Sequence, residues 1–406
     1  MKTIKSSSAG KYLSLTLIAF ALFFVNPILS VAAVGGALAS PKALQTITPN
    51  FLTPSHFTMP EGHVIETMSV LNPGGFKCDD LQVIVAKMDQ MWRGDSLTKQ
   101  QYIADTVVAQ ALLENQTATV GVLEGPKNTT AKVTWVNTCN IVSEDDGDIC
   151  DFGGEELTSS CEDYTVSNGK KSGFTVNETE LFDKTLTAEQ IIADGIMRAT
   201  AQLDQDISTA AAAFLDASAG KNLYTNRGYT ITNSNTVVPA TAWNYTLFPY
   251  LINAAKKNRF INPFIISGQL LSESDIMAQL NGANADGKGA QNAFNAFKRY
   301  YDLFNIDSTV GSEKLFMLSG GSIAFASKTH YTGVRQYDGW QVFTVNSRNL
   351  TKRDGNPVVY EVWYRTRCAN ESVYHDFTIR SKFDWFLNPT GCVEPLSTGI
   401  LGFSCA

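Results

Sequence analysis

The longest regular pattern of apolar and polar positions runs from about Thr187 to Gly220 and predicts one amphipathic helix without a proline. Thr187-Ala-Glu-Gln190 matches the capping-box pattern that opens many helices, and Gly220 is a candidate C-cap. At about 1.5 Å per residue this helix is on the order of 50 Å long, a length typical of a structural spine. The apolar residues that recur at helical spacing are Ile191, Ile192, Ile196, Met197, Ala201, Leu203, Ile207, Ala211 and Phe214.

Short strands and an acidic region precede this helix. Alternating positions predict strands at Thr117 to Leu123, Ala131 to Val136 and Gly173 to Glu180. Between the last two lies an acidic turn region, Ser143 to Glu156. We expect the strand regions that flank it to pair as a long ribbon whose tip carries cysteines.

The remaining elements place the chain in the α+β class. A helical pattern from about Asp79 to Glu114 is divided in two near Gly94. From Lys314 onward the chain is β-rich, and the aromatic residues there alternate along strands, which favours core packing over a platform that stacks sugars or bases. The other elements expected are helices at Pro239 to Lys257, Ser272 to Leu280 and Gly289 to Phe304, a buried strand at Phe264 to Ser267, and paired strands at Val358 to Arg367 and Val373 to Phe386.

The N-terminus has the pattern of a targeting segment. Three lysines precede an apolar run from Leu13 to Val25, and small residues follow as far as Ala37-Leu38-Ala39. This pattern predicts a secretory signal peptide. A retained membrane anchor or a propeptide-like segment remains an alternative, because the apolar and small residues together are long enough to span a bilayer. Residues 40–75 are rich in Pro and Thr and are expected to form an extended arm.

Composition bounds the class of protein. With 406 residues, 44% of them hydrophobic and 17% charged, the chain is globular and long enough for two or three domains. Its net charge of −7 argues against tight recognition of a phosphate backbone.

The seven cysteines are an odd number, and none forms a C-x-x-C pair, which argues against zinc. Two interpretations stay open, disulfides in an oxidising compartment and free thiols. The candidates for a disulfide or a subunit contact are Cys139, Cys150, Cys161, Cys368 and Cys392.

Catalytic signatures are missing from the sequence. It contains no H-E-x-x-H, G-x-S-x-G, P-loop or G-x-G-x-x-G pattern, so we expect no enzyme, no catalytic residue and no cofactor. The acidic residues from Glu144 to Asp148 would suit calcium, but they lack the spacing of an EF-hand, which favours a solvated loop and no metal site. The four histidines, each in a separate element, are His56, His63, His330 and His375.

The order of the elements resembles that of the tailed-phage major capsid protein, the Hong Kong 97 type of fold. In that family an extended loop precedes a long spine helix, an axial domain follows, and the chain returns to a peripheral sheet. Local likeness lies in Pro239 to Asn244, Asn262 to Ser267 and Leu318 to Phe325. Residues 1–39 are the main departure from the family pattern, and the cysteine-bearing acidic loop and the Leu-Gly-Phe-Ser-Cys405 ending have no counterpart in it.

By this resemblance we expect a major-capsid-type α+β fold with an extended β-arm, a spine helix, and peripheral and axial domains. The expected parts are a hydrophobic segment 1–40, an arm with helices 41–115, an extended β-loop 116–186, the spine helix and the start of the peripheral domain 187–238, an axial-like domain 239–340, and returning strands with a tail 341–406.

The resemblance also implies a function. It predicts a non-enzymatic subunit of the virion that self-assembles, as hexamers and pentamers, into an icosahedral phage capsid around DNA. The partners implied are other copies, portal or scaffold proteins, packaged DNA through weak non-specific contact, and a membrane through residues 1–40. The alternative is a secreted or membrane-anchored bacterial surface binding protein with disulfides.

Overall fold

The contacts divide the computed structural model into two units, Met1–Thr58 and Met59–Ala406, and the described residues all belong to the second. Among them, no helix combines the length and the apolar character needed to span a bilayer. The predicted signal or anchor segment 1–40 lies outside the described residues and stays a prediction. The structure describes residues 68–69, 75–76, 78–93, 102–120, 130–135, 160–177, 188–232, 234–282, 297–311, 313–330, 335–337, 339–369, 372–389 and 398–406.

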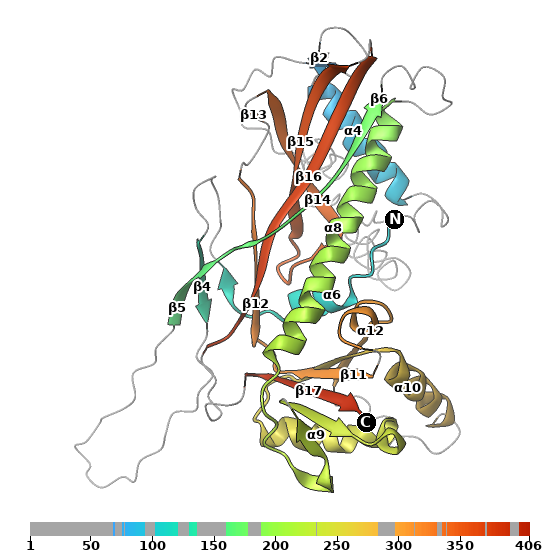
Figure 1. Cartoon of the computed structure of the whole chain (residues 1–406), viewed down its shortest axis with the longest axis vertical. Helices are drawn as coiled ribbons and strands as arrows, with labels where there is room; N and C mark the ends of the chain where they lie inside the picture. The colour runs from blue at the N-terminus through green and yellow to red at the C-terminus, as the bar shows by residue number, and fades with distance from the viewer. Residues whose placement is uncertain are drawn as a thin grey trace, which may run out of the picture. The chain divides into compact units, whose positions relative to one another are not determined.

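The predicted spine helix is confirmed as α8, which spans Ala188–Ser218 over 31 residues. It contacts α4 (Cys78–Arg93) and α6 (Val107–Asn115), and it also packs on the large sheet described next (Figure 1). The expected C-cap is wrong, because the Gly220 N–H donates to the Ile400 carbonyl at 2.8 Å in an isolated β-bridge. Thr187 lies outside the described residues.

A six-stranded antiparallel sheet covers α8 (Figure 1). The predicted pairing of the last two long strands is confirmed, with Tyr364 opposite Phe377. β6 occupies one edge of β16, and β12 and β15 share the other edge end to end. The strands are β12 (Ile323–Lys328), β16 (Ser372–Leu387), β15 (Pro357–Ala369), β14 (Trp340–Thr351), β13 (Arg335–Tyr337) and β6 (Asn168–Asn177).

A second six-stranded sheet packs against α9 (Phe248–Lys257) through an apolar cluster that includes Trp243, Leu251 and Phe403. The C-terminal strand belongs to this sheet and pairs with β11 and β8. Its strands in order are β10 (Lys298–Tyr301), β9 (Phe264–Ser267), β11 (Lys314–Leu318), β17 (Ile400–Cys405), β8 (Asn235–Val238) and β7 (Thr230–Thr232). The helices α10 (Gln269–Gly282) and α12 (Asn305–Thr309) flank the sequence of β10.

A small third sheet forms an arm (Figure 1). It consists of β3 (Thr119–Val120), β4 (Thr130–Trp135) and β5 (Ser160–Thr165), and β4 pairs with β5 from Thr130↔Thr165 to Trp135↔Ser160. The predicted pairing of Ala131 to Val136 with Gly173 to Glu180 is therefore wrong. The described part of the second segment, Gly173 to Asn177, lies in β6 and pairs with β16, because β6 completes the edge of the large sheet over α8.

Three further expectations need correction. A helix was expected at Gly289 to Phe304, but Lys298–Tyr301 within this range forms the strand β10, which pairs in parallel with β9. The helix expected from Pro239 begins only at Phe248, after two 3-10 turns, Ala240–Ala242 and Tyr245–Leu247. The break near Gly94 is confirmed because α4 ends at Arg93, but the next helix begins at Val107.

Gly195 allows α8 to approach β6 closely. A Cβ placed there would lie 2.5 Å from Cε2 and Cζ of Phe174. We expect Gly195→Ala to lower the free energy of unfolding by about 1–3 kcal/mol through overpacking, although alanine favours a helix by about 1 kcal/mol over glycine. Urea denaturation of the unassembled protein measures it. In a Phe174→Leu background the cost of Gly195→Ala should shrink, and an equal cost in both backgrounds would contradict the steric cause.

Candidate functional site

The middle of α8 is tied to the large sheet by one fully buried carboxylate. Asp204 accepts hydrogen bonds from the Ser347 hydroxyl at 2.7 Å, from Asn349 Nδ2 at 2.9 Å and from the Tyr360 hydroxyl. Burial raises the pKa of Asp204 to about 6, although these hydrogen bonds act in the opposite direction. Because β14 and β15 supply the donors, this network fixes the spine helix against the sheet.

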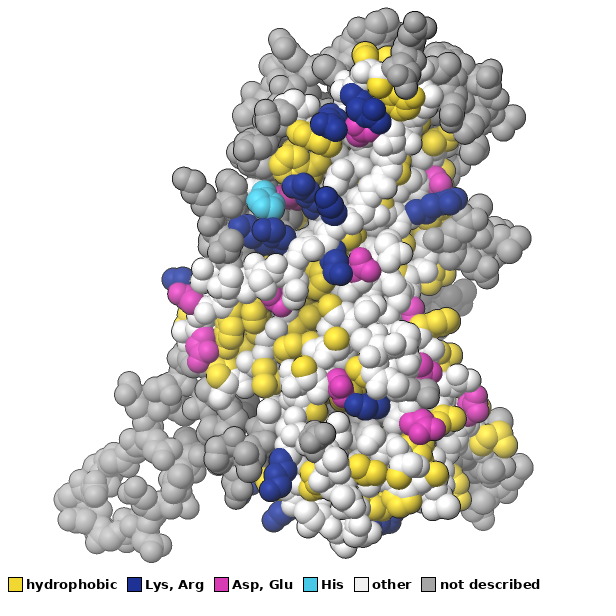
Figure 2. Space-filling model, viewed as in Figure 1, with side chains coloured by type: hydrophobic (Ala, Val, Ile, Leu, Met, Phe, Trp, Pro, Cys, Tyr) yellow, Lys and Arg dark blue, Asp and Glu magenta, His cyan; other side chains and the backbone are white. Residues whose placement is uncertain are grey.

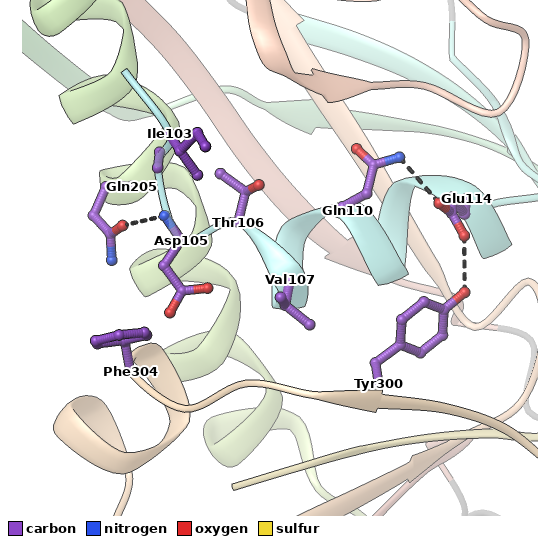
Figure 3. Close-up of a pocket in the computed structure, with 10 residues that line it drawn as sticks. Ile103, Asp105, Thr106, Val107, Gln110, Glu114, Gln205, Tyr300 and Phe304 are labelled. Atoms are coloured by element: carbon purple, nitrogen blue, oxygen red, sulfur yellow. Dashed lines mark hydrogen bonds between the residues drawn. The ribbon is translucent and has the colours of Figure 1, made fainter. Parts of the chain in front are cut away.

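A groove of about 900 Å³ opens beside α6, where α8 and β10 approach it (Figure 3). At one end Gln205 Oε1 accepts a hydrogen bond from the Asp105 backbone N–H at 2.8 Å, next to the ring of Phe304. At the other end the Tyr300 hydroxyl donates to Glu114 Oε2 at 2.9 Å. The groove is open, and Ile103 and Phe304 at its rim are exposed apolar side chains.

A polar cluster lies behind the Asp105 end of the groove. Asn305 is buried and donates to the Asp105 carbonyl at 2.8 Å and to the Ser208 hydroxyl at 3.2 Å. Burial and the nearby carboxyl of Asp302 raise the pKa of Asp105 to about 6. Gln205 Nε2 donates to the Asn305 side-chain oxygen at 2.6 Å, so the cluster joins α8, α12 and the segment before α6.

Asp302 fixes the start of α12. Its Oδ1 accepts backbone N–H hydrogen bonds from Phe304, Asn305 and Ile306, at 3.0, 2.5 and 3.0 Å. We expect Asp302→Ala to lower the free energy of unfolding by about 2 kcal/mol, because it leaves buried N–H groups without a partner. Thermal unfolding measures the change. Asp302→Asn keeps an acceptor oxygen and should lose less, so an equal loss in both variants would contradict this cause.

The base of the arm is packed against the large sheet. Trp135 is buried and its indole N–H donates to the Tyr164 hydroxyl at 3.2 Å. The Tyr164 ring in turn stacks on Phe386 of β16, with ring centroids 4.5 Å apart. Ser167, just before β6, and Asn168, its first residue, donate to the Asp384 carboxylate at 3.0 and 2.8 Å. The arm therefore leaves the sheet from a fixed base.

The cysteines singled out from the sequence are only partly described. Cys161 on β5 and Cys368 on β15 carry free thiols and are exposed, and Cys405 is also free. Cys139, Cys150 and Cys392 lie outside the described residues. A disulfide or subunit contact at the five candidate positions thus stays a prediction.

The two described histidines have structural partners. His330 Nδ1 lies 3.0 Å from Glu361 Oε2, and His375 Nδ1 lies 2.9 Å from the Tyr364 hydroxyl. His56 and His63 lie outside the described residues. Within the described ranges, no group of three or more His, Cys, Asp or Glu side chains is arranged to hold a metal.

Comparison with known proteins finds neither a matching family model nor a matching curated protein. Solved structures do match, with low identity. The capsid asymmetric unit of cyanophage A-1(L) is 13% identical, with a TM-score of 0.41, over 74% of this chain and 93% of that one. The capsid of a native GTA particle is 13% identical, with a TM-score of 0.37, over 75% and 91%. The mature capsid of bacteriophage PhiM1 is 9% identical, with a TM-score of 0.36, over 70% and 85%.

These structures are capsids, the class named by the resemblance in the sequence. Their TM-scores all lie below 0.5. The α+β class is confirmed by the described helices and sheets.

Proposed function

We propose that the chain is a structural subunit that self-assembles into the icosahedral shell of a tailed phage, enclosing DNA in the virion without catalysis. The observation that carries this proposal is the arm. Only Val166 and Ser167 separate β5 from β6, yet β6 belongs to the sheet over α8 and β5 to the small arm sheet. A ribbon that leaves its own core from a fixed base is suited to contact with another copy of the chain.

Exposed apolar side chains support contacts with further copies. Phe304 is 65% exposed and Ile103 56% exposed at the groove, and Met277 on α10 is 57% exposed. Repeated contacts between different faces of identical subunits would bury such side chains and supply the free energy of assembly.

The finer features of this proposal follow the family resemblance. Copies would associate as hexamers and pentamers, with portal or scaffold proteins as further partners and residues 1–40 available to a membrane. The net charge of −7 supports only weak, non-specific contact with packaged DNA. The division into parts 1–40, 41–115, 116–186, 187–238, 239–340 and 341–406 belongs to the same proposal.

Electron microscopy of the purified protein tests the proposal, because assembly is visible as closed particles of uniform size. We expect particles from the full chain and a sedimentation coefficient that rises with protein concentration. A variant in which a short Gly-Ser linker replaces residues 138–158 should keep the melting temperature and lose the particles.

Two outcomes would overturn the shell. One is a full chain that stays monomeric at every concentration, and the other is a linker variant that forms the same particles. Export with cleavage after Ala39, read from the N-terminal residue of the mature protein, would instead support a surface binding protein.

A further inference from the structure

One face of the large sheet carries an excess of cations. Residues paired across antiparallel strands point to the same side, and the register puts Lys171 beside Arg380 and Arg380 beside Glu361. Among the residues whose side chains the structure describes, six cations share this face with three carboxylates. They are Lys171, Lys328, Arg365, Arg367, Arg380 and Lys382, against Glu361, Asp376 and Asp384.

Aromatic rings hold the guanidinium groups of this cationic face in place. The Arg365 guanidinium lies 4.4 Å from the ring centroid of Trp340, that of Arg367 lies 4.7 Å from Tyr374, and that of Arg380 lies 5.0 Å from Trp363. Arg365 and Arg367 are 45% and 44% exposed, and both contact Asp376. Groups that are already ordered lose little entropy when they bind an anion. Figure 2 shows Lys and Arg side chains gathered over this part of the sheet.

Two lysines on the cationic face repel one another. Lys328 pairs directly with Lys382 across β12 and β16. Burial and the charge of Lys382 lower the pKa of Lys328, and the opposing effect of Glu361 does not restore it. Lys328 is buried and Lys382 is partly exposed, so an anion that binds beside Lys382 would offset the charge that acts on the Lys328 amine.

The same chain carries a segment of matching charge. Residues 143–156 contain seven carboxylates and no lysine or arginine, namely Glu144, Asp145, Asp146, Asp148, Asp151, Glu155 and Glu156. This segment belongs to the 24 residues between β4 and β5, which the arm carries. Arginine forks and carboxylates form the strongest charge-assisted hydrogen bonds available between protein surfaces.

Chain length separates this segment from Arg365 and Arg367 of its own copy. Figure 1 shows β5 and β6 following one another along one line, and Thr175 of β6 lies beside Asp376, which pairs with Arg365. Ser160 and Thr175 are 15 residues apart, or about 50 Å at the rise of a strand. Half of the 24 residues reach at most about 40 Å, so an occupant of the Arg365 end comes from a second copy.

We propose that the cationic face binds the acidic segment 143–156 of a neighbouring copy, so that each subunit clasps the next through charge. The inference rests on the proposed function, since it names the partner of the arm within the shell. The face thus sets which surfaces of two copies meet and makes that contact sensitive to salt.

Binding of a labelled peptide to the unassembled full chain tests this contact. The peptide covers residues 138–159 with serine in place of Cys139 and Cys150, and fluorescence anisotropy measures its affinity at low salt. We expect the affinity to fall at least about tenfold when the seven acids of the peptide become Asn or Gln. The affinity of the unchanged acidic peptide should fall by about tenfold when the salt is raised to 0.5 M. Arg365→Gln with Arg367→Gln should weaken binding by a similar factor.

Matched variants separate the contact from general effects. Arg380→Gln with Lys382→Gln leaves the partners of Asp376 intact and should also weaken binding, which guards against misfolding of the first pair. Lys256→Gln with Lys257→Gln removes the same charge from exposed positions on α9 and should leave the affinity unchanged. Circular dichroism checks that each variant is folded.

Several results would overturn the inference. One is equal affinity for the acidic and the neutral peptide, and another is a loss of affinity in the Lys256/Lys257 control as large as in the arginine variants. A third is a duplex DNA of about 20 base pairs that binds the face and is not displaced by the peptide. A full chain that forms no particles would overturn the proposed function but leave peptide binding measurable. Particles without peptide binding would overturn the clasp alone.

Discussion

Replacing Phe377 by alanine is expected to lower the free energy of unfolding by about 3–5 kcal/mol, the range for removing a buried phenylalanine. Phe377 is 1% exposed and lies on the side of β16 that faces α8. Its ring stacks on Phe174 of β6 at 4.9 Å between centroids and lies 4.8 Å from Tyr364 of β15. The substitution therefore removes contacts with both neighbouring strands and leaves a cavity under the spine helix.

Urea denaturation of the unassembled protein at neutral pH measures this effect. Phe304→Ala is the matched control, because the same ring is deleted at a position that is 65% exposed, and its cost should stay within about 0.5 kcal/mol. A cost below about 1 kcal/mol for Phe377→Ala would mean that neighbouring side chains fill the cavity. The packing of β6, β15 and β16 would then not depend on the Phe377 ring.

The parts of the fold that the sequence predicted well are those with a long local repeat. The apolar stripe of α8 continues over many turns, and buried residues alternate with more exposed ones along β16 from His375 to Trp385, opposite and beyond β15. Such patterns report burial on one face, whichever element lies opposite. This explains why the spine helix and the β15–β16 pair were found within a few residues of their true ends.

The elements that were missed depend on partners distant in sequence. β5 reads Ser-Cys-Glu-Asp-Tyr-Thr, which has no apolar alternation, and it is a strand because β4 supplies its hydrogen bonds. β10 follows a helix-like pattern, but parallel pairing with β9 decides its conformation. In both cases tertiary pairing overrides a weak local preference.

The candidate site was predicted less well than the fold. Sequence reasoning singled out cysteines, whereas the described contacts centre on Asp204, Asn305 and the cations of the large sheet. One signal was present for the first, because Asp204 follows Leu203 on the buried side of α8, where an acid is unexpected. The donors to this carboxylate, Ser347 and Tyr360, lie more than 140 residues away and leave no local trace.

Protonation of Asp204 is expected to make the folded protein more stable as the pH falls from 7.5 to 4.5. Burial raises the pKa of this carboxyl to about 6 from an ordinary value of 3.8. Between these values the folded chain holds a proton that the unfolded chain has released. The penalty for the buried charge is thus fully present above the folded pKa and disappears as the pH falls towards the unfolded pKa, a difference of about 3 kcal/mol.

Comparison with Asp204→Asn isolates this contribution, because asparagine keeps the shape and cannot titrate. The free energy of unfolding of the wild type minus that of Asp204→Asn should rise by about 2 kcal/mol between pH 7.5 and pH 4.5, the part of the full difference that falls in this window. Asp354→Asn is the control of opposite sign, since hydrogen bonds from Asn356 hold the pKa of Asp354 below its usual value. Its difference should fall on acidification. A difference for Asp204→Asn that does not change with pH would mean that the network with Ser347, Asn349 and Tyr360 fully offsets the cost of burying the charge.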